Sequence, residues 1–171
     1  MKEPIPSKDA GPLSGATYER ARRLANLAVW TVALQCRRLK TPEPEDGEFL
    51  FRRWADFQFL IVALARCRRA AVLAGHIDEI ADEMKIALDA FDTALPMLRT
   101  MRDIGEHFDD YAMELGRNQD VSRKSLEVGV VGEKIFQWLG YELDADKALV
   151  AAQLLFSAIK AAEGGVRARS V

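Results

Sequence analysis

Residues that bind metals or react covalently are scarce in this chain, which has two cysteines and two histidines among 171 residues. Cys36, Cys67, His76 and His107 are scattered, and their spacing does not match a zinc site. We expect both cysteines to be small core residues in a reducing compartment. The sequence therefore predicts neither a metal site nor a cofactor. An acidic face on the helix expected at 77–95 offers a cation site as a minor alternative.

Long apolar runs and a strong net charge are also missing. The longest apolar stretch, 27–34, is too short to cross a bilayer, and Glu3, Pro4 and Pro6 stand where a signal peptide has an apolar run. The net charge of −2 provides no overall attraction to a polyanion, so charge neither predicts nor excludes nucleic-acid binding. We expect a soluble cytoplasmic protein with no membrane partner.

Apolar residues at helical spacing dominate the chain. They make up 49% of it and charged residues 29%, which is typical of a globular domain rather than a disordered or membrane protein. Apolar stripes, prolines and capping residues predict helices over about 14–40, 46–75, 77–95, 96–116 and 144–163. In the first helix, a broad apolar surface predicts that this helix is central to the bundle; it consists of Leu24, Leu27, Ala28, Trp30, Val32 and Leu34.

Two short runs before the last helix follow a different pattern. Apolar residues alternate with polar ones over 126–130, a Gly-Glu pair interrupts, and branched and aromatic residues resume to 138. This pattern predicts a β-hairpin at about 126–138, with a helix as the alternative.

The short connections between helices favour antiparallel neighbours. The predicted fold is mainly α, an up-and-down bundle of about five helices with a small β-hairpin before the last helix. We expect a single helical domain over 14–163, a flexible segment at 1–13 and a flexible tail at 164–171.

The stretch Arg102-Asp103-Ile104-Gly105-Glu106-His107 carries the most suggestive chemistry. An arginine followed by four residues and a histidine resembles the R-x4-6-H signature of the HEPN superfamily, named for higher-eukaryote and prokaryote nucleotide binding. The resemblance implies a metal-independent endoribonuclease of the toxin or defence type, in which a homodimer brings two copies of the motif into one cleft. It assigns Arg102 to the scissile phosphate, Asp103 to orienting a ribose hydroxyl and His107 to proton transfer.

The resemblance implies single-stranded RNA as the ligand, and basic residues near the motif would be needed to hold its phosphates. Arginine outnumbers lysine by sixteen to eight and occurs in groups such as Arg66, Arg68 and Arg69, which suit phosphate or are simply solvated helix faces. The basic residues expected to contact RNA near the motif are Arg99, Arg117, Arg123 and Lys124. Acids at 106, 109 and 110 oppose such binding.

Helical geometry leaves an alternative open. On one straight helix, Arg102 and His107 point roughly 140° apart, so either a partner subunit or a distortion at Gly105 is needed. Ordinary ion pairs explain the same charges, with Arg102 paired to Glu106 and acids flanking His107. The alternative function is a non-catalytic helical module for dimerisation and for nucleotide or protein binding, with an antitoxin or regulatory protein as a possible partner.

Overall fold

The computed structural model describes residues 14–41, 52–127, 129–131 and 135–168. The segment 1–13 predicted to be flexible, the turn of the predicted hairpin at 132–134 and the last three residues lie outside this part of the chain.

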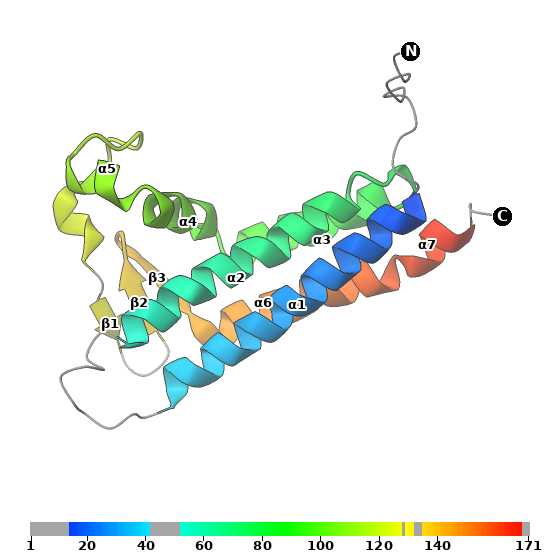
Figure 1. Cartoon of the computed structure of the whole chain (residues 1–171), viewed down its shortest axis with the longest axis horizontal. Coiled ribbons are helices and arrows are strands. Elements are labelled where there is room, and N and C mark those ends of the chain that lie inside the picture. The colour runs from blue at the N-terminus through cyan, green and yellow to red at the C-terminus, as the bar shows by residue number, and fades with distance from the viewer. Residues whose placement is uncertain (1–13, 42–51, 128, 132–134, 169–171) are drawn as a thin grey trace, which may run out of the picture.

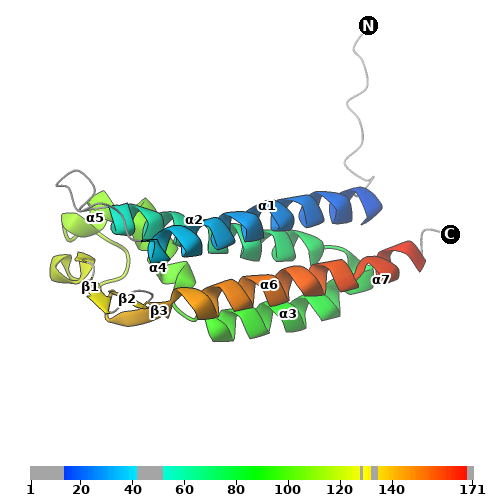
Figure 2. The ribbon, with the colours of Figure 1, turned by 90° about the horizontal axis from the view of Figure 1, so that it is seen from below.

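Four long helices form the body of the molecule. They are α1 (Ser14–Lys40), α2 (Arg52–Ala74), α3 (Ala81–Ala94) and α6 (Ala145–Ala161). Figures 1 and 2 show them running up and down, with α1 and α2 in one layer and α3 and α6 in the other. Each helix packs on its two neighbours around this ring. The predicted up-and-down bundle is confirmed.

The chain between α3 and α6 builds one end of the molecule (Figure 1). It contains α4 (Leu98–Glu106), α5 (Phe108–Ala112), the 3-10 turn η2 (Arg123–Leu126), β1 (Gly129–Val131), β2 (Ile135–Trp138) and β3 (Tyr141–Asp144). The strands form an antiparallel sheet in the order β1-β2-β3, with Val130 opposite Phe136 and Phe136 opposite Leu143. The pairing of β1 with β2 confirms the predicted hairpin.

The third strand was not predicted from the sequence. It follows a two-residue turn in which Leu139 and Gly140 both have positive φ, 56° and 77°. Hairpin turns of this kind favour asparagine or glycine at the first position, so a leucine there provides no turn signal. The predicted helix cap at Asp144 is confirmed, because its carboxylate accepts hydrogen bonds from the backbone N–H groups of Asp146 and Lys147 at 2.8 and 3.2 Å.

Aromatic side chains join this sheet to the bundle. Phe57 of α2 stacks on Phe136 of β2 with ring centroids 4.6 Å apart, and Trp54 meets Trp138 edge-on at 5.4 Å. The Trp138 indole N–H donates to the carbonyl oxygen of Leu126 at 3.0 Å, which satisfies its buried polar atom. The sheet is therefore fixed against the N-terminal end of α2.

The apolar surface predicted on α1 is only partly buried, because Ala28 and Val32 lie in the core and its leucines and tryptophan do not. Three of the eight buried residues of α1 are alanines, whereas Leu24, Leu27, Trp30 and Leu34 are exposed. Alanines on both α1 and α2 are buried where these two helices pack together. Because small side chains let two helices approach closely, these alanines suit the contact between α1 and α2 better than leucine or tryptophan would.

The end of the last helix also differs from the prediction. A short helix α7 (Glu163–Ala168) follows α6 and includes Gly164 and Gly165, so residues 164–168 are not a flexible tail. A side chain at Gly165 would lie 3.0 Å from the Ile80 side chain. Glycine at this position therefore serves close packing and does not end the helix.

The stretch Ala145–Val166 has the length and hydropathy of a membrane-spanning helix. In the structure its first part, α6, packs against α1, α2 and α3 as a bundle helix. The core helices of soluble proteins meet the same length and hydropathy criteria.

Both cysteines lie in the core as free thiols. The Cys36 thiol is 3.3 Å from the carbonyl oxygen of Ala145. Burial raises the pKa of Cys36 from 9.0 to about 11 and that of Cys67 to about 12. These thiols are therefore protonated and poorly nucleophilic near neutral pH.

We expect the free energy of unfolding to fall as the pH rises above 9.0, because the unfolded chain releases the thiol protons that the folded chain retains up to about 11 and 12. Urea unfolding across this range would measure the fall. A variant with Cys36→Ala and Cys67→Ala is the control, and it should show a shallower fall because its remaining groups titrate unchanged. Equal slopes would contradict the assignment.

Candidate functional site

The motif stretch forms two helices separated by a break. Helix α4 ends at Glu106, and His107 has non-helical backbone angles (φ −118°, ψ 34°) before α5 begins at Phe108. The His107 N–H still donates to the carbonyl oxygen of Asp103 at 3.1 Å. A distortion at Gly105, one of the two alternatives above, is not present, because Gly105 lies within α4 and the break falls at His107. The prediction of one continuous helix over 96–116 is wrong.

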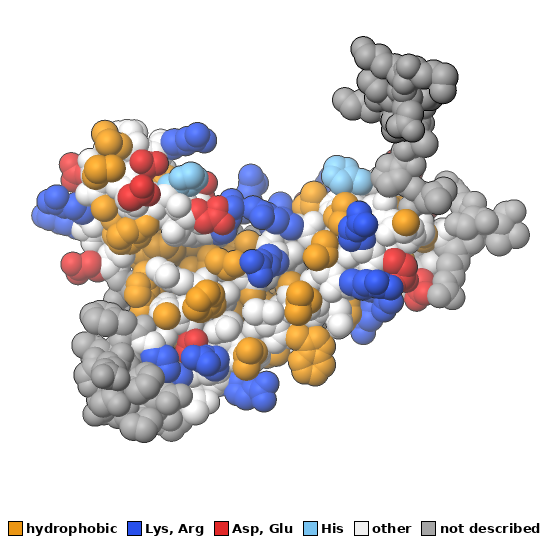
Figure 3. Space-filling model, viewed as in Figure 1, with side chains coloured by type: hydrophobic (Ala, Val, Ile, Leu, Met, Phe, Trp, Pro, Cys, Tyr) orange, Lys and Arg blue, Asp and Glu red, His pale blue; other side chains and the backbone are white. Residues whose placement is uncertain are grey.

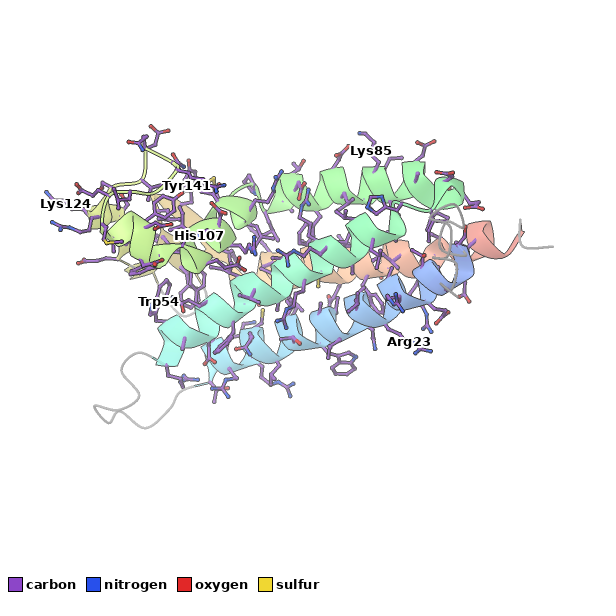
Figure 4. All side chains as sticks on the ribbon, turned by 45° about the horizontal axis from the view of Figure 1, so that its top comes forward. Arg23, Trp54, Lys85, His107, Lys124 and Tyr141 are labelled. Atoms are coloured by element: carbon purple, nitrogen blue, oxygen red, sulfur yellow. The ribbon has the colours of Figure 1, made fainter. Side chains whose placement is uncertain are left out.

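The charged groups of the motif are paired locally. Arg102 forms an ion pair with Glu106, as the spacing predicts. The exposed His107 imidazole has its Nδ1 3.9 Å from a carboxylate oxygen of Asp110. His107 lies on the α4–α5 side of the molecule, and Figure 4 shows its position. Both contacts match the alternative of surface ion pairs.

A cleft of about 640 Å³ lies between α2 and α4. Its wall on α2 contains Arg68 and Arg69, and its wall on α4 contains Arg99, Arg102 and Asp103. Figure 3 shows Lys and Arg side chains gathered beside the hollow between these helices. Four guanidinium groups thus line one concave surface, although the chain as a whole carries a net charge of −2.

Two of these arginines are already held by acids. Arg68 makes two hydrogen bonds to Asp92, at 2.7 and 2.6 Å, and the pKa of its guanidinium is raised chiefly by this interaction. Arg102 is held by Glu106. Arg69 and Arg99 are exposed and have no hydrogen-bonded or ionic partner within the described ranges. Arg69 and Arg99 are therefore the lining arginines whose positive charge is available to a ligand.

The far wall of the cleft depends on a tyrosine packed against a glycine. The Tyr111 ring is buried, and its hydroxyl oxygen accepts a hydrogen bond from the backbone N–H of Asn118 at 3.2 Å. A Cβ at Gly116 would lie 2.2 Å from this ring. Gly116 must therefore lack a side chain for Tyr111 and Asn118 to occupy their places in the wall.

The structure brings together only part of the predicted site. Arg99, Arg102 and Asp103 line the cleft, whereas His107, Arg117, Arg123 and Lys124 are not among its lining residues. Lys124 points away at the end of the molecule (Figure 4).

The residues that sequence reasoning did not assign to the site are Arg68, Arg69, Tyr111 and Asn118. The only signal for the first two was the arginine group at 66–69, which resembles a solvated helix face equally well. No pattern in the sequence indicated that α2 faces α4.

The comparisons with known proteins identify no relative of this chain. No protein-family model matches the chain, and no curated protein or solved structure matches it significantly. Within the part of the chain that the structure describes, no three His, Cys, Asp or Glu side chains are grouped so that they could hold a metal ion. Conclusions about function therefore depend on the cleft itself.

We expect Gly116→Ala to destabilise the α5 end, because the new methyl group and the Tyr111 ring cannot occupy the same space. The predicted cost is about 1–3 kcal/mol. Thermal unfolding and hydrogen exchange at 111–118 would measure it. Gly105→Ala is the matched control, since its Cβ would have its nearest neighbour at 3.8 Å and alanine favours a helix. Equal effects of the two changes would contradict the steric argument.

Proposed function

We propose that this protein binds the phosphate groups of single-stranded RNA in the arginine cleft between α2 and α4. The supporting observation is that Arg69 and Arg99 reach one concave surface from two different helices, with no acid holding either within the described residues. A cytoplasmic location, where RNA is present, is part of the proposal.

Guanidinium groups suit this ligand for a geometric reason. Each presents a planar fork that donates two parallel hydrogen bonds to phosphate oxygens, and its charge persists at any physiological pH. Thr100 and Asn118 add hydroxyl and amide groups to the lining, which can bond to ribose hydroxyls. The cleft thus offers both charge and hydrogen bonds to a nucleotide.

The surrounding acids restrict the path of an RNA strand. Glu106, Asp109 and Asp110 are exposed on the α4–α5 side, where they repel phosphates. Arg66 and Arg69 are exposed on α2, three residues apart and therefore on one face. We therefore place the strand along α2, with Arg99 contacting it from α4.

We expect a fluorescent single-stranded RNA to bind about tenfold less tightly to Arg69→Ala or Arg99→Ala than to the unchanged protein, because each change removes a charged phosphate contact. Fluorescence anisotropy at several salt concentrations would measure this, and each variant should reduce the salt slope by about 0.7. Arg20→Ala is the control, since it removes an exposed arginine of α1 outside the cleft lining. A similar loss in all three variants would indicate attraction by general charge and overturn the site.

Competition distinguishes a strand from a small ligand. Inorganic phosphate or a mononucleotide that displaces the RNA at equal concentration would assign the cleft to a small phosphate ligand. Displacement only by longer strands supports the RNA proposal.

A homodimeric HEPN-like endoribonuclease is the second candidate. It is favoured by the positions of Arg102 and Asp103 in the cleft wall and of the exposed His107 imidazole at the break immediately after α4. One chain does not complete this site, because His107 is not a lining residue of its own cleft. A second copy must supply the imidazole, and the toxin or defence role and an antitoxin partner belong to this candidate.

We expect His107→Ala to abolish cleavage of single-stranded RNA in the presence of a chelator, with at least about a hundredfold loss of rate, because no other group in that copy of the motif can transfer the proton. RNA binding should remain. His76→Ala is the matched control, because it removes the other exposed histidine. Gel analysis of end-labelled RNA would measure the rates. This candidate would be eliminated if cleavage survives His107→Ala, or if the wild-type protein saturated with RNA does not cleave it. Either result would leave the RNA-binding proposal standing.

A further inference from the structure

Large apolar side chains form an exposed band on one outer face of the bundle. We call it the α1 face, and it consists of Leu24 (49% exposed), Leu27 (66%), Trp30 (67%) and Leu34 (46%) of α1 with Phe59 (60%) of α2. The α1 residues recur at spacings of three and four, so they share one side of the helix. A contiguous band of this kind marks an interaction surface more often than scattered apolar residues do.

The bundle itself does not use this band. Arg38 reaches Asp56 on α2 at 2.8 Å, and Lys40 pairs with Asp146 on α6, so both neighbours of α1 lie on its other sides. Phe59 lies three residues after Asp56, and Leu34 lies four residues before Arg38. Because α1 and α2 pack together in opposite directions (Figure 1), Phe59 of α2 and Leu34 of α1 lie at a similar level along the bundle.

Among the described residues of α1 and α2, the exposed charges beside this band are of one sign. Arg20, Arg23 and Arg37 are exposed on α1, and Arg66 is exposed on α2. The only acid of α1, Glu19, is paired with Arg22 at 2.9 Å, and the only acid of α2, Asp56, is buried. Figure 3 shows apolar and basic side chains together along these two helices. The α1 face is therefore apolar at its centre and basic at its rim.

We infer that the α1 face binds an amphipathic helix of another protein, one whose apolar stripe is flanked by Asp and Glu. The band from Leu24 to Leu34 is about 15 Å long, which matches about three turns of a docked helix. Acidic side chains beside that stripe meet the arginine rim. A second copy of this face is a poor partner, because arginines would then oppose arginines.

The inference is independent of the cleft but adjacent to it. Arg66 belongs to the rim of the α1 face, and Arg69, one turn later on α2, lines the cleft. A helix bound on the α1 face therefore lies next to the route that we propose for RNA, and its acids compete with RNA for Arg66 alone.

A synthetic peptide tests the inference with the full chain. The probe is a labelled helix of about 18 residues with leucines at spacings of three and four and glutamates beside them. We expect it to bind the protein, and Leu27→Ser or Trp30→Ser to weaken binding by about tenfold or more. Leu154→Ser is the matched control, because Leu154 is equally exposed (67%) on α6 and should leave affinity unchanged. Unchanged melting temperatures would show that all variants fold.

Charge supplies the second arm of the test. A peptide with lysine in place of every glutamate should bind about tenfold less tightly, because the rim repels it. Equal binding of both peptides, or no effect of Leu27→Ser, would overturn the inference. Anionic lipid vesicles bound through Leu27 without peptide binding would assign the face to a membrane surface. A dimer that Leu27→Ser dissociates would assign it to self-association, and either result would also overturn the inference.

Discussion

Close packing of α1 on α2 through small side chains is the constraint on which the rest of the molecule depends. Ala21, Ala25 and Ala28 are fully or almost fully buried on α1, and several alanines of α2 are buried as well. Helices that meet through alanines approach more closely than helices that meet through leucines. This contact fixes the rotation of both helices about their axes. It turns Leu24, Leu27, Trp30 and Leu34 of α1 outward, and it leaves Arg66 and Arg69 of α2 facing solvent.

The segment between α3 and α6 provides the second wall of the cleft, opposite α2. Phe136 and Trp138 of β2 pack on Phe57 and Trp54 of α2, so the sheet is held at one end of the bundle. Buried Met101 and Ile104 anchor α4, and α4 packs on α2. The arginines of α4 thereby come to face those of α2. The aromatic contacts of the sheet and the packing of α4 on α2 together hold the segment that provides the second wall of the cleft.

The two charged surfaces differ in how their charges are balanced. On α4 and α5, Arg102 and His107 each lie beside an acid of their own helix or its neighbour, and this arrangement suits a stable surface better than strong attraction of phosphate. On α2, Arg66 and Arg69 lie on a helix whose single acid is buried near its other end. The arginines without an acidic partner in the described residues therefore lie mainly along α2, where we propose that anions bind. His107 lies at the break after α4, beside Asp110 and outside the lining of the cleft.

Local patterns in the sequence were sufficient to predict the long helices, the hairpin of β1 and β2 and the cap at Asp144. These features depend on neighbours within a few residues. Local patterns were insufficient for β3, because Leu139 adopts a left-handed conformation that leucine rarely adopts. They also did not show which part of the apolar surface of α1 is buried, since Ala28 and Val32 are buried and Leu24, Leu27, Trp30 and Leu34 are exposed. A helical period identifies both an alanine stripe and a leucine stripe, and only the partner helix decides which is buried. The sequence also did not predict that Arg69 and Arg99 line the same cleft. They are thirty positions apart in the sequence, and only tertiary packing brings α4 to the side of α2.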